Sequence, residues 1–436
     1  MKHGFRKFSL FRDTLLVILP VLFIITLLIW ALYSIEPAPP KSFIMTTGSE
    51  TGAYHAFAKR YQEILSRYGI RIELRNSSGS VENLLRLKDP ASGVQVGFVQ
   101  GGISETKDVT DLMSLGSLYY EPLWIFYRGS GSIDRINQLL GKKLAIGPEG
   151  SGTRNLVLQL LSANGIDADK KMLPLGGSAA AEALKKGEVD AVFMIAGIDA
   201  PVVKDLTHTS GINIMSLSQA AAYSKQFPFL SMVTLPKGGI DLAQNLPAQD
   251  VAMIAPTANL IARNDIHPAI VALLVKAAID IHNSPDLFQG IREFPAALHS
   301  EIPMSSDAER YLKSGPPMLQ RYLPFWVATM IDRFIVILLP LLVLIPVVKL
   351  IPSIYAWRIR SRIFHLYGEL GKLDKDIRNS YMPDVHDSYL QRLKVLEEES
   401  NRKSVPLSYA HQLYMLREHI NLVRNELLDK RSQNES

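Results

Sequence analysis

The sequence predicts an open α/β protein that lies between two apolar segments and is followed by a helical tail. In the middle of the chain, short apolar runs typical of strands alternate with helical runs, a pattern that indicates parallel sheets covered by helices. Residues 14–35 and 326–357 are rich in Leu, Ile and Val. Beyond residue 357, apolar residues recur every three or four positions, as on one face of a helix.

Composition narrows the class of protein. The 436 residues are enough for two or three compact units, and 47% of them are apolar while 20% are charged, so the chain is not disordered. The net charge is +5, and the positive excess lies mainly in the chain ends beyond the two apolar segments. Basic flanks of this kind are typical of the cytoplasmic ends of membrane segments. The middle has no basic stripe with interleaved aromatic residues, so we expect no nucleic-acid partner. The absence of cysteine excludes disulfides and thiolate metal sites.

The first apolar segment predicts a membrane anchor. Residues 14–35 carry no charge, and at about 1.5 Å per residue they can cross a hydrocarbon layer of roughly 30 Å. The basic residues ahead of it place residues 1–13 in the cytoplasm; they are Lys2, Arg6, Lys7 and Arg12. A cleaved signal peptide is the alternative. The length of the run, and the lack of a small-x-small cleavage site in residues 30–34, favour an uncleaved anchor.

The second apolar segment, residues 326–357, predicts a second crossing but is less regular. Lys349 interrupts it, and three prolines weaken its helix: Pro340, Pro346 and Pro352. Trp326 and Trp357 suit the two membrane interfaces, and the arginines after residue 357 suit a cytoplasmic flank. Two crossings would put both termini in the cytoplasm and the middle outside. An interfacial or buried helix is the alternative reading.

The middle of the chain, residues 42–325, accounts for the α/β prediction. A proline-rich linker at residues 36–41 leads into it. Strands are expected at residues 43–46, 71–74, 94–99, 143–146 and 191–195. Helices are expected at residues 53–68, 81–88, 153–164 and 179–186.

Three strand-to-helix loops are rich in Gly, Ser and Thr, at residues 46–54, 75–83 and 147–154. In open α/β sheets, ligands bind beyond the carboxyl ends of the strands. Glycines let the backbone approach a ligand, and hydroxyls and free helix N–H groups suit a carboxylate or phosphate. Ser80 is the expected N-cap of its helix. Ordinary helix capping is the alternative for each loop alone, whereas three such loops favour a shared anion site. The loops lack the P-loop lysine and the G-x-G-x-x-G spacing, which disfavours a nucleotide.

The order of these motifs resembles one family. The runs are TTGSETGAYHAFAKRY, NSSGSVENLLRL, VGFVQGG, LAIGPEGSGTRNLVLQLL, AVFMIAGIDAPVVKDL and FPFLSMVTLP. They are similar to the TAXI family of solute-binding proteins, the extracytoplasmic receptors associated with TRAP transporters, over residues 43–283. The resemblance implies a two-lobed type II periplasmic binding protein fold. Lobe 1 would comprise about residues 42–120 and 229–325, and lobe 2 about residues 121–228.

The resemblance also implies a function and a site. The function is capture of a small organic anion or amino acid and its delivery to a TRAP-type permease at a bacterial inner membrane, with the binding domain on the periplasmic side. Lobe 1 would contribute Gly48, Ser49, Gly52, Tyr54, Ser78, Gly79, Ser80, Asn83 and Gln100. Lobe 2 would contribute Ser151, Gly152, Thr153 and Gly197. Many relatives carry Ser-Asp where this chain has Gly101-Gly102, so we expect a carboxylic acid without an amine.

Charged residues beside the loops extend this prediction. Arg154, and also Arg75, can pair a carboxylate through two hydrogen bonds. The alternative is that both are solvated or bridge the lobes. His267-Pro268 is typical of a helix start. The remaining histidines and acids lack metal-ligand spacing, and the loops lack a nucleophile motif, so we expect no metal, no cofactor and no enzyme activity.

The tail, residues 358–436, predicts a helical hairpin or small bundle in the cytoplasm. One seam comprises Leu366, Leu370, Leu373 and Ile377, and another Leu413, Leu416, Ile420, Val423 and Leu427. Self-packing and partner recognition both remain open. Two functional hypotheses follow: a membrane-tethered receptor for a TRAP-type importer and, alternatively, a membrane-bound ligand sensor that signals through the tail. An enzyme on the same fold is the third.

Overall fold

The computed structural model describes residues 22–23, 25–27, 29–30, 33, 37–103, 109–298, 301–379, 381–403 and 405–435. The predicted cytoplasmic N-terminus and most of the first apolar segment, residues 14–35, lie outside these residues. The chain divides into two compact units. One is Pro37–Met330, and the other combines the N-terminal residues with Ile331–Ser436.

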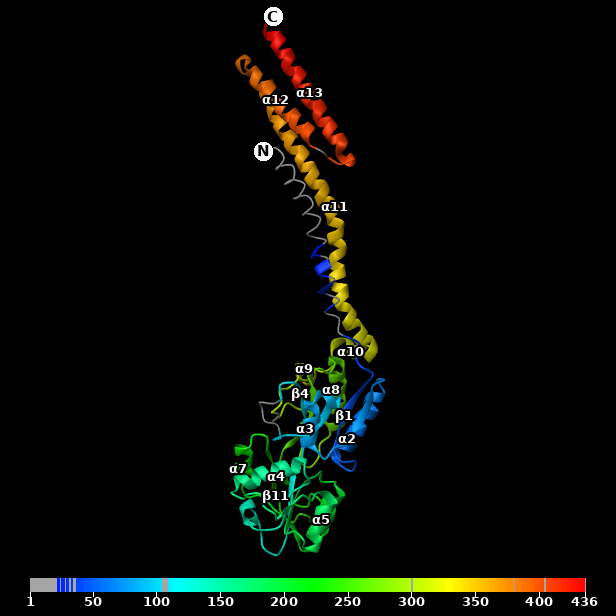
Figure 1. The fold of residues 1–436 in the computed structure, drawn as a ribbon, viewed down its shortest axis with the longest axis vertical. Coiled ribbons are helices and arrows are strands. Elements are labelled where there is room, and N and C mark those ends of the chain that lie inside the picture. Colours follow the sequence, from blue (N-terminus) through cyan, green and yellow to red (C-terminus); the bar gives the residue numbers. More distant parts are fainter. Residues whose placement is uncertain are drawn as a thin grey trace. The chain divides into compact units, whose positions relative to one another are not determined.

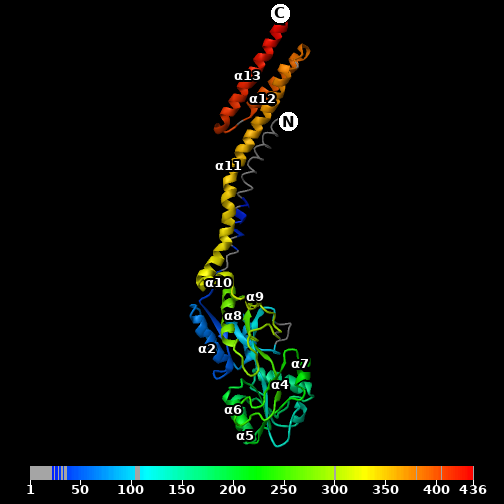
Figure 2. The same ribbon diagram turned by 180° about the vertical axis from the view of Figure 1, so that it is seen from behind.

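The first lobe of Pro37–Met330 is built on a five-stranded sheet. Its strands are β1 (Ser42–Thr46), β2 (Arg71–Arg75), β3 (Val94–Gln100), β4 (Leu112–Tyr120) and β12 (Thr257–Arg263), in the order β2-β1-β3-β12-β4. Strands β2, β1 and β3 are parallel to one another, and β12 runs antiparallel to its neighbours β3 and β4. Helices α2 (Ala53–Ser66) and α8 (Pro268–His282) share one hydrophobic core with the strands, and α3 (Ser80–Lys88) packs into another (Figures 1 and 2).

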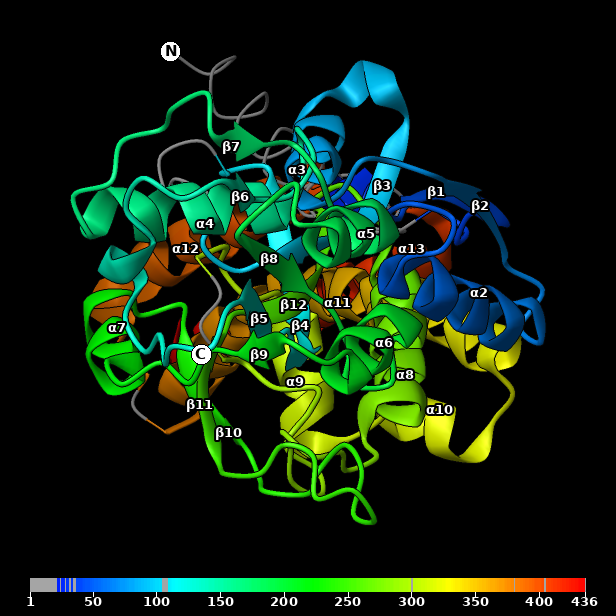
Figure 3. The ribbon, with the colours of Figure 1, turned by 90° about the horizontal axis from the view of Figure 1, so that it is seen from below.

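The second lobe repeats this arrangement. Its strands are β5 (Leu123–Arg128), β6 (Leu144–Ala145), β7 (Met172–Leu173), β8 (Ala191–Ile195) and β9 (Ile212–Ile214), in the order β7-β6-β8-β5-β9 (Figure 3). As with β12 in lobe 1, the strand in the fourth position of this sheet, β5, is antiparallel to its neighbours β8 and β9. Helices α4 (Gly152–Ala163) and α7 (Ala220–Gln226) pack into one core, and α5 (Gly177–Lys186) and α6 (Pro201–His208) into the other. The side chains of β5 alternate between the two cores, as a strand buried on both faces requires.

Two crossovers join the lobes. The first passes through Glu121 and Pro122, between β4 and β5, and the second through Pro256, between β11 (Val251–Ala255) and β12. The chain therefore returns to lobe 1 later than the expected residue 229. Strands β10 (Ser231–Leu235) and β11 belong to lobe 2, because they contact α7 and their apolar residues share a hydrophobic core with α5 and α6.

The predicted alternation of strands and helices is present, with one local correction. Ser80 is not the N-cap of α3, as expected, but its first residue, and Gly79 stands at the cap. The Ser80 hydroxyl has other partners, on β3 and α2. The prediction at His267-Pro268 is confirmed: α8 begins at Pro268, and the His267 side chain accepts a hydrogen bond from the N–H of Ala269 (3.1 Å).

The remaining helices of Pro37–Met330 are α9 (Ser306–Ser314) and α10 (Met318–Tyr322). Helix α11 (Phe325–Asn379) then runs through the second apolar segment, and the three prolines expected to weaken it do not end it. Among the residues that the structure describes, we find no helix with enough length and apolar character to span a bilayer.

The tail consists of the end of α11, with α12 (His386–Arg402) and α13 (Leu407–Glu435). Both predicted seams lie in one hydrophobic cluster, the first on α11 and the second on α13, with Leu393 of α12 between the same side chains. Arg378 of α11 pairs with Glu426 of α13 at 2.9 Å. The two seams thus pack against each other within this chain.

Candidate functional site

Two of the three predicted loops meet where the lobes face each other. Helix α3 of lobe 1 contacts α4 of lobe 2 near their N-termini (Figure 1). The Gln100 side chain, at the end of β3, donates a hydrogen bond to the carbonyl of Gly152 (Nε2 to O, 3.3 Å). Gln159 of α4 donates to the carbonyl of Gly102 in the opposite direction (2.9 Å). The loops therefore form a direct interface between the lobes.

Glycines permit this close approach. Gly79 has φ +139°, and a Cβ there would lie 3.2 Å from the Cα of Ser151. Gly150 has φ +75°, and a Cβ there would lie 2.5 Å from the Ser78 hydroxyl. Both backbone conformations disfavour other residues, and a Cβ at either position would press on the opposite lobe. The Gly-rich composition that suggested a ligand site thus also serves contact between the lobes.

The helix N-termini at this boundary differ in their capping. Helices α2 and α3 follow Gly52 and Gly79, and neither has a side-chain cap. In α4, the Ser151 hydroxyl accepts a hydrogen bond from the backbone N–H of Arg154 (3.2 Å). The first N–H groups of a helix have no partner within the helix and carry partial positive charge. The uncapped N-termini of α2 and α3 can therefore donate to an anion.

A polar network runs from this boundary to the first crossover. The Ser80 hydroxyl accepts from the backbone N–H of Gln100 (3.1 Å) and lies 3.1 Å from the Tyr54 hydroxyl. Tyr54 donates to the Glu121 carboxylate (OH to Oε2, 3.0 Å), and its ring stacks on Phe98. Three predicted site residues, Tyr54, Ser80 and Gln100, are thus linked by hydrogen bonds.

Glu121 has an unusual environment for a carboxyl group. Only 7% of the residue is exposed, and burial raises its pKa to about 8, opposed in part by the hydrogen bond from Tyr54. The pKa of Tyr54 is likewise raised well above its usual value, first by burial and then by the charge of Glu121. At neutral pH, both groups are therefore mostly protonated.

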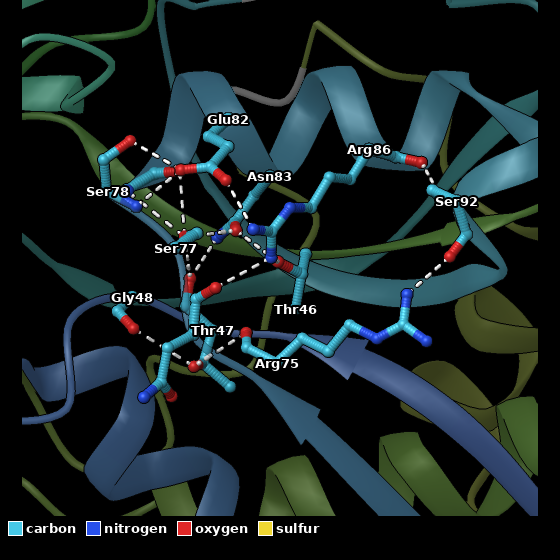
Figure 4. A network of polar contacts seen from close by, with 12 residues as sticks. Thr46, Thr47, Gly48, Arg75, Ser77, Ser78, Glu82, Asn83, Arg86 and Ser92 are labelled. Carbon is cyan, nitrogen blue, oxygen red and sulfur yellow. Dashed lines mark hydrogen bonds and ion pairs between the residues drawn. The ribbon is translucent and has the colours of Figure 1, made fainter.

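Asn83 of α3 joins the first two loops through its side-chain amide (Figure 4). Its side-chain oxygen accepts from the hydroxyls of Thr46 (2.6 Å) and Ser77 (2.7 Å). Its amide nitrogen donates to the carbonyls of Thr47 and Phe98, the latter at 2.8 Å. Because all four hydrogen-bonding positions of the amide are used inside the protein, Asn83 positions the loops, and we assign it no ligand contact.

The two candidate arginines differ in their partners. Arg75 donates to the carbonyl of Ser92 (2.6 Å) and lies 3.4 Å from Glu73, so its charge is already engaged. Arg154, near the start of α4, has a buried Nη1 without a hydrogen-bond partner among the described residues. A buried guanidinium nitrogen without a partner is costly, which favours an anion at this position.

The other predicted site residues occupy varied positions. Gly48 is buried against the Tyr54 ring, whereas Ser49 is exposed at the rim of the first loop, next to Gly52. Thr153 is half-buried in the first turn of α4. Gly197 follows β8 and is exposed, and no described atom lies within 4 Å of a Cβ built there.

Sequence reasoning missed Glu121. Its signal was an acidic residue between two strand-like apolar runs, directly before Pro122 and at the expected lobe boundary. Within the described parts of the chain, no three His, Cys, Asp or Glu side chains gather to hold a metal ion. The site offers backbone N–H groups, hydroxyls, one buried carboxyl and one guanidinium, which is the chemistry of binding a small polar molecule.

Comparisons with known proteins give a family for this fold. The model of the NMT1-like family matches residues 45–314, which is more than half of the chain. Similar solved structures include the periplasmic aliphatic sulphonate binding protein SsuA from Escherichia coli (16% identity; 55% of this chain and 73% of that chain covered; TM-score 0.35). An ancestral arginine-binding protein bound to arginine is another (16% identity; 55% of this chain and 92% of that chain covered; TM-score 0.36). At these values the likeness carries no conclusion about what this chain binds.

Proposed function

The chain belongs to the NMT1-like family, and from that premise we propose that it is a solute receptor that closes two lobes around a small organic ligand. One observation carries the proposal. The end of β3 and the start of α4, on different lobes, meet through Gln100 and Gly152, beside the N-terminus of α3, which has no side-chain cap. A ligand that binds there contacts both lobes, so it favours the state in which they are together.

The ligand of this proposal carries a negative charge. Uncapped N-termini of α2 and α3 and the unpartnered Nη1 of Arg154 all favour an anion. Each helix end contributes about 0.3–1 kcal/mol when exposed and up to about 2 kcal/mol when partly buried. Micromolar binding needs about 8 kcal/mol in total, so hydroxyls and the guanidinium must add to the helix ends.

We further propose that the receptor serves a TRAP-type importer, as a TAXI-type subunit tethered to a bacterial inner membrane. The sequence runs at the three loops support this assignment, as do the uncharged residues 14–35 with their basic flank. In this arrangement Pro37–Met330 lies on the periplasmic side, and a permease and the lipid bilayer are its partners.

Binding is tested by thermal unfolding of the full-length protein, in mild detergent, with a panel of small carboxylates and amino acids. A ligand that binds only the folded state raises its stability by RT ln(1 + [L]/Kd), about 2.7 kcal/mol at a hundredfold excess over Kd. Replacing Ser151→Ala together with Thr153→Val should remove most of that gain. Ser162→Ala, at the exposed far end of α4, is the matched control. A panel without any stabilising compound would contradict the proposal.

A sensor is the second candidate, and one observation favours it. Helix α11 begins in the lobe 1 core, where Phe325 is buried and Trp326 donates to the carbonyl of Tyr68 (2.8 Å). The same helix continues without a break into the hydrophobic cluster of the tail. Removing residues 363–436 distinguishes the candidates: a transport receptor retains uptake, whereas a sensor loses its cellular response to the ligand.

A further inference from the structure

Glu121 lies where both connections between the lobes pass. It follows β4 at the first crossover, and its backbone N–H donates to the carbonyl of Pro256 in the second crossover (2.9 Å). Its side chain is buried, and Oε2 accepts from the Tyr54 hydroxyl. Glu121 therefore contacts both the polar network at the lobe boundary and the second segment that joins the lobes.

The carboxyl group is only partly satisfied. No described residue donates to Oε1, and no basic side chain among the described groups acts on its ionisation. A carboxylate offers about four acceptor positions, and here one is filled. Its titratable neighbours are Tyr54 and Tyr119, two phenols whose own pKa values are raised by burial. The surroundings therefore provide neither a positive charge nor enough donors for a buried carboxylate.

The same network leads to the anion side of the site. Ser80 is the first residue of α3 and lies 3.1 Å from the Tyr54 hydroxyl, which in turn lies 3.0 Å from Glu121. A single tyrosine hydroxyl thus separates a helix N-terminus from a carboxyl group that has no basic partner among the described residues. The helix N-terminus favours an anion and the carboxyl group favours a cation. Because the two lie this close together, they suit a small ligand that carries both charges.

We propose that Glu121 and Tyr54 bind the ammonium group of an amino-acid ligand whose carboxylate lies at the N-terminus of α3. This inference rests on the proposed receptor function and reverses the expectation of an amine-free acid. The ammonium supplies both the missing charge and the donor for Oε1. Because a nearby positive charge favours the ionised carboxyl, ligand binding lowers the pKa of Glu121 from about 8 and releases a proton at neutral pH.

The test compares amines with matched hydroxyl compounds on the full-length protein. The probes are the twenty standard L-amino acids and their 2-hydroxy acid analogues, which keep the carboxylate and side chain. Binding is measured by calorimetry at pH 7 in phosphate and in Tris, two buffers with different ionisation enthalpies. We expect one class of amino acids to bind, its hydroxy analogue to bind at least 100-fold more weakly, and the buffers to reveal proton release.

Glu121→Gln and Glu188→Gln are the variants. Glu121→Gln keeps the shape of the neutral carboxyl and should fold normally, yet bind the amino acid at least 100-fold more weakly and without proton release. Glu188, exposed in lobe 2, should tolerate the change. Equal binding of hydroxy acids, or normal binding by Glu121→Gln, overturns the ammonium assignment while the receptor function stands. If neither set of probes binds, the receptor function fails and the inference with it.

Discussion

Replacing Gly152→Ala should weaken ligand binding without weakening the fold of lobe 2. Gly152 is the first residue of α4 and does not have a left-handed φ, so alanine fits the helix. Alanine is favoured over glycine in helices by up to about 1 kcal/mol. In the arrangement with the lobes together, however, the new Cβ would lie 2.5 Å from Oε1 of Gln100 and 3.3 Å from Cδ1 of Ile103.

The size of the effect follows from these contacts. Overpacking typically costs 1–3 kcal/mol, and moving Gln100 away also breaks its hydrogen bond to Gly152, worth about 0.5–1.5 kcal/mol. The closed state is therefore destabilised by about 2–4 kcal/mol, which corresponds to about 30- to 1,000-fold weaker binding. Since the open state has no such contact, the thermal stability of the ligand-free protein should stay the same or rise.

The assay is calorimetric titration with the strongest compound of the panel, in a double-mutant cycle with Gln100→Ala. Truncating Gln100 removes the clashing amide, so Gly152→Ala should have little further effect in that background. Unchanged affinity of Gly152→Ala would refute the reasoning. So would an equal loss of affinity in the presence and absence of the Gln100 side chain, because the clash would then not be its cause.

The remaining predictions concern buried polar groups of lobe 1 and the guanidinium of lobe 2. The contribution of Glu121 to stability should fall as pH rises from about 4.5 to 8, because its raised pKa keeps its proton in the folded state while the unfolded chain loses it; relative to the wild type, Glu121→Gln should remove this contribution in denaturation at several pH values. The contribution of His282 should fall as pH drops from about 6.5 to 3, because burial lowers its pKa to about 3, and His282→Phe should remove it; the two contributions oppose each other between about pH 4.5 and 6.5, so the wild type should lose stability most clearly above and below that range. Since Nε2 of His282 is buried and unpaired among the described residues, the same change should stabilise the protein by about 1–2 kcal/mol near pH 7, and a lower melting temperature would contradict this. Asn83→Ala should destabilise by about 2–4 kcal/mol in urea unfolding, because four hydrogen bonds are lost, and a change below 1 kcal/mol would show that water replaces the amide. Arg154→Ala should weaken anion binding about tenfold or more in titrations while leaving stability unchanged, and unaltered affinity would exclude the guanidinium from the site.

Local patterns predicted most of the α/β elements but not where the chain changes lobe. Strand and helix periodicity depends on neighbours in sequence, so β1, α2, β3 and α4 were close to their observed bounds. The second crossover was expected near residue 229 and lies at Pro256. Strands β10 and β11 follow residue 229, yet the core that they share with α5 and α6 assigns them to the second lobe.

The candidate site shows the same division. The three Gly, Ser and Thr loops were visible in the sequence because strand-to-helix turns impose local requirements on backbone and capping. The role of Asn83 as a buried support and the engagement of Arg75 depended on partners distant in the chain. Residue type alone indicates what a side chain can bind, not whether the protein already satisfies it.

By itself the sequence determined the α/β class, the order of the elements, the polar loops and the apolar ends, because each is a property of short stretches of chain. Tertiary structure alone decided that Glu121 is buried at a crossover beside Tyr54, with one oxygen that no described residue binds. The physical reason is that burial and hydrogen-bond satisfaction, which set the charge of a carboxyl group, arise from residues that meet only when the two lobes are assembled.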